Sequence, residues 1–140
     1  MNNQTGRAAA PGNGTATRRE SPHKGKTGLR RVVNAFLYSL SGLNAALKHE
    51  DAFRQEVILA AFLIPGAFLL THDNLARALM IGSVLLVLVV ELINSAIEAT
   101  VDRISLKDHE LAKRAKDIGS ASVFIAMMNV IVMWGLALSM

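Results

Sequence analysis

The chain has 140 residues, of which 51% are apolar, with no cysteine and a formal net charge of +4. This length indicates a single domain, and the absence of cysteine excludes a disulfide framework and thiolate metal sites. Residues 1–26 are polar, so the apolar residues are concentrated in the remainder. This distribution indicates a membrane protein, whose positive charge reflects topology and lipid contact rather than a nucleic acid partner.

The first segment, residues 1–26, is rich in Gly, Ala, Asn, Thr and Pro and has no apolar periodicity. Such a sequence cannot bury enough surface to offset the entropy of ordering, so we predict a disordered tail. It contains no apolar stretch of the kind found in a signal peptide.

Residues 28–49 place apolar side chains at helical spacings, with basic and polar side chains mostly elsewhere around the helix. The pattern predicts an amphipathic helix, and beside a membrane protein such a basic helix is expected to lie in the plane of the interface. The alternative is a helix that packs on another protein surface.

Three apolar segments follow, and each predicts a membrane-spanning helix. They comprise about residues 52–70, 75–101 and 117–138. The segments that precede or separate them are charged or polar, at 50–56, 71–74 and 102–117. Thr71 or Asp73 could cap the second span. The predicted fold of residues 27–140 is therefore an all-α membrane protein with three transmembrane helices and an N-terminal amphipathic surface helix.

The distribution of lysine and arginine predicts the orientation of these spans. Residues 1–56 hold nine of these side chains, residues 99–117 hold five, and residues 71–77 hold only Arg77. Cytoplasmic segments carry the excess of positive charge. We therefore expect the N-terminus and residues 102–117 to face the cytoplasm, and the turn and the C-terminus to face outward.

A stripe of polar residues ends the second span. Glu91, Asn94, Glu98 and Asp102 follow one another at intervals of three or four residues, so they lie on one face of a helix. Glu91 comes directly after a long apolar run, and Glu98 lies about 10 Å further along by helix rise. Carboxylates at such depth are rare and usually face a bundle interior or a wet cavity. For Asp102 we favour the simpler interpretation of a surface ion pair with a nearby lysine or arginine.

Two carboxylates at unequal depth suit two tasks. The deeper Glu91, removed from water, suits a general base, and the shallower Glu98 suits a hard cation such as Mg²⁺, which usually also binds phosphates. Glu50 is expected at a depth similar to that of Glu98, and Lys116 and Asp117 are expected on the same side. This arrangement favours phosphoryl transfer from a soluble nucleotide to a molecule dissolved in the bilayer. No GxxxxGK[ST] loop or kinase Gly-rich loop is present, and a proton pathway would use the same residue types.

Three segments carry a resemblance to a known family: ELINSAIEATVDRI (91–104), EDAFRQE (50–56) and AKDIGSA (115–121). At these segments, and over roughly residues 27–138, the sequence resembles the prokaryotic diacylglycerol kinases, small integral membrane enzymes. The resemblance implies a homotrimeric helical bundle in the bacterial inner membrane. It also implies phosphorylation of diacylglycerol to phosphatidic acid at the cytoplasmic face, with ATP and Mg²⁺.

The resemblance also implies roles for individual residues. Glu91 would be the catalytic base and contact the lipid, Asn94 would position the reacting groups, and Ser120 would contact the lipid. Glu50 and Glu98 would bind the Mg²⁺ that accompanies ATP. Contacts to the nucleotide would come from Arg31, Tyr38, Lys107, Asp108, His109, Lys116 and Asp117. Ser105 and Lys107 stand where we expect glycine and commonly an acidic residue in this family.

Three other interpretations compete with a diacylglycerol kinase. Undecaprenol kinase has the same fold and chemistry with a polyprenol acceptor. A small proton-coupled transporter would use Glu91 as the proton carrier, but would not need the cluster of Lys107, His109, Lys116 and Asp117. A structural membrane subunit would leave the number and sidedness of the carboxylates unexplained.

Overall fold

The computed structural model describes residues 28–104 and 110–139, and the regular structure in these ranges is entirely α-helical. The helices are α1 (Leu29–His49), α2 (Asp51–Leu70), α3 (Asn74–Ile104) and α4 (Glu110–Ser139). This confirms the predicted all-α class with one amphipathic helix followed by three long apolar ones. The expected disordered tail, residues 1–26, lies outside the described residues.

Helix α1 begins in one compact unit, which extends to Phe36, and ends in a second unit that starts at Leu37. In the first unit, Gly28 has a φ of 82°, a left-handed conformation that favours glycine, and the helix begins directly after it. The apolar side chains of α1 are largely exposed in both units, among them Val32, Phe36 and Leu40. An apolar stripe that is exposed within each described unit is what an amphipathic helix at a membrane surface requires.

A tight corner joins α1 to α2. Glu50 is the single residue between them, with an extended backbone, and its amide donates to the Ala46 carbonyl over 2.9 Å. Arg54 closes the corner, because its Nη1 atom donates to the Leu47 and Lys48 carbonyls, each over 3.2 Å. Arg54 also forms an ion pair with Asp51. The last carbonyls of α1, which have no partner within their own helix, are thereby satisfied and Glu50 is held in place.

The turn between α2 and α3 is capped by Asp73, one of the two residues predicted to do so. Its Oδ1 atom accepts from the Ala76 amide over 2.7 Å, and its own amide donates to Thr71 Oγ1 over 3.1 Å. A small core lies at this end of the molecule. It consists of Ala67, Ala76, Met80 and Ala137, and Trp134 packs against it and donates its Nε1 proton to the Met80 carbonyl. The small side chains let α2, α3 and α4 approach closely.

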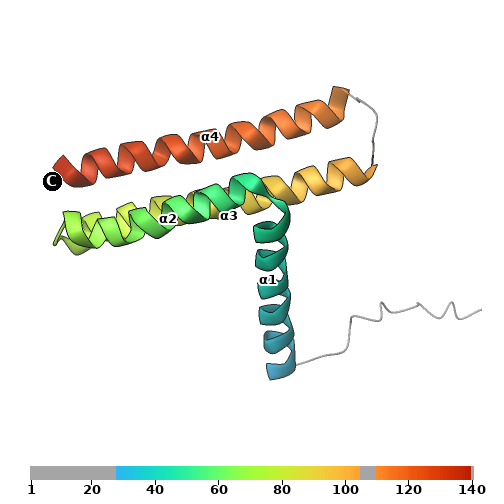
Figure 1. The fold of residues 1–140 in the computed structure, drawn as a ribbon, viewed down its shortest axis with the longest axis horizontal. Helices are drawn as coiled ribbons and strands as arrows, with labels where there is room; N and C mark the ends of the chain where they lie inside the picture. The colour runs from blue at the N-terminus through green and yellow to red at the C-terminus, as the bar shows by residue number, and fades with distance from the viewer. Residues whose placement is uncertain (1–27, 105–109, 140) are drawn as a thin grey trace, which may run out of the picture. The chain divides into compact units, whose positions relative to one another are not determined.

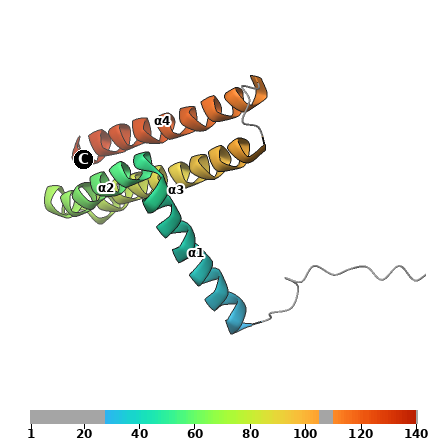
Figure 2. The ribbon, with the colours of Figure 1, turned by 45° about the vertical axis from the view of Figure 1, so that its right-hand side comes forward.

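Helices α2, α3 and α4 are each long and apolar enough to cross a membrane. They run side by side with alternating direction, and α3 packs against both α2 and α4 (Figures 1 and 2). Helix α4 begins at Glu110, earlier than the span expected from about residue 117. The difference arises because hydropathy marks the part of a helix that suits lipid, whereas the charged residues 110–117 are good helix formers that extend α4 beyond that part.

Candidate active site

Helix length alone places Glu50 beside the polar stripe of α3. Helices α2 and α3 leave the same turn, and α2 has 20 residues whereas α3 has 31. Since both rise about 1.5 Å per residue, the beginning of α2 comes level with the residues of α3 near Asn94. Two of the three segments that carry the resemblance, 50–56 and 91–104, are therefore neighbours in space.

The stripe itself is buried where it was expected to be deep. Only 4% of Glu91 and 7% of Asn94 are exposed, and Ser95 beside them is also buried. Glu98 is half-buried, and its Oε1 atom accepts a hydrogen bond of 3.2 Å from Asn94 Nδ2. This hydrogen bond ties the proposed positioning residue to a proposed metal ligand.

Three further carboxylates lie near Glu91, so the cluster holds four. The charges of Glu98 and Glu50 both act on it, and its own charge acts on Glu56 of α2. Glu56 was not predicted as a site residue, although it is only 6% exposed. No donor within the described part of the chain hydrogen bonds to either of its carboxyl oxygens. Its signal in the sequence was a glutamate at the very edge of an apolar run.

The N-terminal part of α4 brings a cation to this cluster. Lys116 Nζ lies 2.6 Å from Asp102 Oδ1, and the same ammonium is close enough to interact with Glu98. Asp102 therefore has the ion-pair role that we favoured from the sequence. Asp117 and Ser120 are exposed on the first turns of α4.

The described structure does not test a role in the cluster for the remaining predicted site residues. Arg31 belongs to the first compact unit, and Tyr38 is exposed on α1. Lys107, Asp108 and His109 lie outside the described residues.

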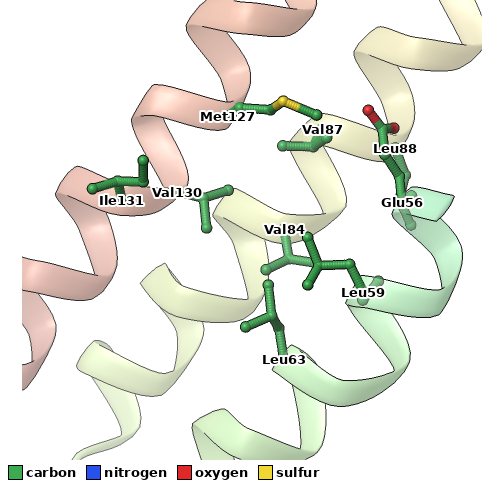
Figure 3. Close-up of a pocket in the computed structure, with 10 residues that line it drawn as sticks. Glu56, Leu59, Leu63, Val84, Val87, Leu88, Met127, Val130 and Ile131 are labelled. Carbon is green, nitrogen blue, oxygen red and sulfur yellow. The ribbon is translucent and has the colours of Figure 1, made fainter. Parts of the chain in front are cut away.

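An apolar cavity of about 310 Å³ adjoins the carboxylates. Its walls come from α2, α3 and α4, and Glu56 is its one acidic lining residue (Figure 3). On α3 the lining residues are Val84, Val87 and Leu88, and Glu91 follows one turn later. Along α3 the order is thus an apolar cavity, then the buried carboxylate, then the half-buried and exposed polar residues. Glu91 therefore lies between an apolar cavity on one side along α3 and polar or charged side chains on the other.

The carboxylates suit Mg²⁺, although in the described ranges no three acidic or histidine side chains converge tightly enough to form a protein-only metal site. Mg²⁺ is usually held by only one or two carboxylates together with substrate phosphates. Glu50, at the corner before α2, and Glu98, on α3, offer two carboxylates of this kind. The Glu50 side chain makes no capping hydrogen bond to α2, so its oxygens are not occupied by that role.

Comparison with known proteins shows the family to which the chain belongs. The sequence model described as prokaryotic diacylglycerol kinase matches residues 37–138. The chain is 58% identical over 114 residues to the diacylglycerol kinase of Pseudomonas aeruginosa, covering 81% of this chain and 93% of that protein. It is 54% identical to the enzyme of the same name from Haemophilus influenzae (78% and 92% covered) and 48% identical to that from Escherichia coli K12 (77% and 88% covered).

Proposed function

Because the chain belongs to the prokaryotic diacylglycerol kinase family, we propose that it transfers the γ-phosphoryl group of ATP to diacylglycerol, which yields phosphatidic acid and ADP. The observation that carries the proposal is the position of the buried Glu91, within the matched region, between an apolar cavity and a charged cluster. Transfer from a nucleotide to a lipid alcohol requires a reactive group between an apolar and a charged environment, because the lipid is dissolved in hydrocarbon and the nucleotide in water.

Glu91 acts as the general base. As the lipid hydroxyl oxygen attacks the γ-phosphorus, Glu91 takes its proton, and the bond from phosphorus to the ADP oxygen breaks. The shielding of Glu91 from water excludes bulk solvent from the reacting hydroxyl, which disfavours hydrolysis of ATP. The apolar cavity next to Glu56 offers a volume suited to hydrocarbon of the lipid.

Positioning and charge neutralisation supply the rest of the catalysis, as phosphoryl transfer requires. Asn94 holds the Glu98 carboxylate through its hydrogen bond. Lys116 offers an ammonium to the phosphates. Glu50 and Glu98 would hold Mg²⁺, which when bound neutralises the phosphate oxygens of ATP.

Further contacts complete the proposal. The nucleotide also contacts Asp117 on α4, Arg31 and Tyr38 on α1, and the segment at 107–109, and the lipid contacts Ser120. The enzyme is a homotrimer in the bacterial inner membrane, with its N-terminus and its active site at the cytoplasmic face. Many large apolar side chains on the three spans are exposed in a single chain, which supports contact with lipid and with further copies.

The test is phosphorylation of diacylglycerol and of undecaprenol, measured side by side with purified protein in mixed micelles containing ATP and Mg²⁺. We expect a strong preference for diacylglycerol. A preference for undecaprenol would retain the fold and the chemistry but change the acceptor. Failure of a folded protein to phosphorylate either lipid would refute the kinase function and favour a proton carrier at Glu91.

A further inference from the structure

Helix α4 presents a glycine to the side chain of Asn94. Gly119 is buried, and a Cβ atom built on it would collide with Asn94 Oδ1. The same Cβ would lie 3.2 Å from Asn94 Cγ, which is closer than such contacts normally allow. The Asn94 carboxamide therefore occupies the space that any side chain at position 119 would take.

The backbone gives no other reason for glycine at this position. Among the described glycines, Gly28 alone has a positive φ, so Gly119 has an ordinary helical conformation that alanine would adopt more readily. Glycine inside a helix weakens the helix. The presence of Gly119 is explained by the space that it leaves for the Asn94 carboxamide.

The Asn94 carboxamide is fixed from two sides. Its Nδ2 atom donates to Glu98, and its Oδ1 atom is buried against Gly119, where no donor from the described residues reaches it. Since this oxygen accepts no hydrogen bond from a described residue, its position is set by packing against Gly119 and not by a hydrogen bond. Displacement of the carboxamide would lengthen or break its hydrogen bond to Glu98.

We propose that Gly119 is a positioning residue, which by lacking a side chain seats the Asn94 carboxamide and through it orients the Glu98 carboxylate. The packing part of this inference stands on the structure alone, and its consequence for catalysis rests on the proposed function. Gly119 acts through Asn94.

The packing is tested by thermal unfolding of four proteins in detergent micelles: the wild type, Gly119→Ala, Asn94→Ala and the double variant. Gly119→Ala is expected to lower the melting temperature in the wild type, because the new methyl group collides with the carboxamide. It is expected to raise the melting temperature in the Asn94→Ala background, where the obstacle is gone and only the gain in helix propensity remains.

Gly135→Ala is the matched control on the same helix. A Cβ at position 135 would meet no atom of the described residues within 4 Å. This control is expected to leave the melting temperature unchanged or raised, and to leave activity unchanged. If Gly119→Ala raises the melting temperature of the wild type as Gly135→Ala does, or if the double variant fails to fold while Asn94→Ala folds, the packing part of the inference is overturned.

The catalytic part is tested by titrating Mg²⁺ in the diacylglycerol phosphorylation assay. Gly119→Ala is expected to raise the Mg²⁺ concentration for half-maximal activity by about tenfold, the effect of losing one hydrogen bond to a charged group. Asn94→Ala is expected to raise it similarly, and the double variant no further than Asn94→Ala. A rate loss in Gly119→Ala with an unchanged Mg²⁺ requirement, or additive effects in the double variant, would refute the positioning role. Inactive wild type would refute the proposed function instead, and the melting temperatures would still judge the packing.

Discussion

The corner between α1 and α2 permits a sharp prediction about how Glu50 is held. Arg54→Met removes the guanidinium that bridges the Leu47 and Lys48 carbonyls, while it keeps an apolar stem and a good helix former. Since Glu50 is the single residue between the two helices, a loosened corner releases the carboxylate proposed to bind Mg²⁺. We therefore expect Arg54→Met to raise the Mg²⁺ concentration for half-maximal activity more than it raises the KM for diacylglycerol.

The magnitude follows from the contacts that are lost. Two carbonyls share one Nη1 atom at 3.2 Å, and Arg54 is partly exposed, so the pair of hydrogen bonds is worth roughly 1–2 kcal/mol rather than the larger value of buried charged contacts. The ion pair with Asp51 adds little, because both side chains are solvated. If this whole free energy opposes the binding of Mg²⁺ at Glu50, the Mg²⁺ concentration for half-maximal activity rises about five- to thirtyfold.

The assay is diacylglycerol phosphorylation at saturating lipid and ATP over a range of Mg²⁺ concentrations. Asp51→Asn is the control, because it removes the ion pair and leaves both backbone hydrogen bonds. It is expected to shift the Mg²⁺ requirement less than about threefold. An unchanged requirement in Arg54→Met, or an equal shift in both variants, would refute the claim that the backbone contacts of Arg54 hold Glu50.

Three further predictions concern the carboxylates and the cation of the site. Glu91→Gln should lower turnover by at least about a hundredfold while the protein still assembles as a trimer on size-exclusion chromatography, and activity above a few per cent would remove Glu91 from the role of base. Glu50→Gln and Glu98→Gln should each raise the Mg²⁺ requirement, and a wild-type Mg²⁺ titration in either variant would break that assignment. Lys116→Met should raise the KM for ATP about tenfold or more, whereas Asp102→Asn, which removes the same ion pair, should change it less than about threefold. Equal effects of the last two changes would mean that the ion pair, and not contact with phosphate, accounts for the loss.

Much of the fold follows from periodicity and charge. Apolar spacing predicted the amphipathic helix and the three spans, and short polar side chains before an apolar run predicted a cap at Thr71 or Asp73, of which Asp73 provides it. The interval of three and four residues placed Glu91, Asn94 and Glu98 on one face, where the structure buries the first two. These features depend on residues close in the sequence, which is why a single sequence reveals them.

The contributions of Glu56, Arg54 and Gly119 were not predictable in the same way. Each depends on a meeting between helices: Glu56 with Glu91 across α2 and α3, Arg54 with the end of α1, and Gly119 with Asn94 across α3 and α4. Helical periodicity gives the face of a residue but not the register of the neighbouring helix. A glycine whose function is to leave space has, in addition, no chemical signal of its own.

The length of α2 has a consequence for the lipid environment. Its 20 residues span about 30 Å, which is the thickness of the hydrocarbon layer of a typical bilayer, so the turn between α2 and α3 and Glu50 stand one such thickness apart. A thicker or thinner bilayer creates hydrophobic mismatch, which is relieved by tilting α2 or deforming the bilayer at a modest cost per ångström. Either adjustment shifts the carboxylates relative to the depth at which the proposed lipid substrate presents its hydroxyl group. We expect activity to peak in vesicles whose hydrocarbon thickness matches the length of α2 and to fall in both longer-chain and shorter-chain lipids. The length of α2 would then make the activity sensitive to membrane thickness.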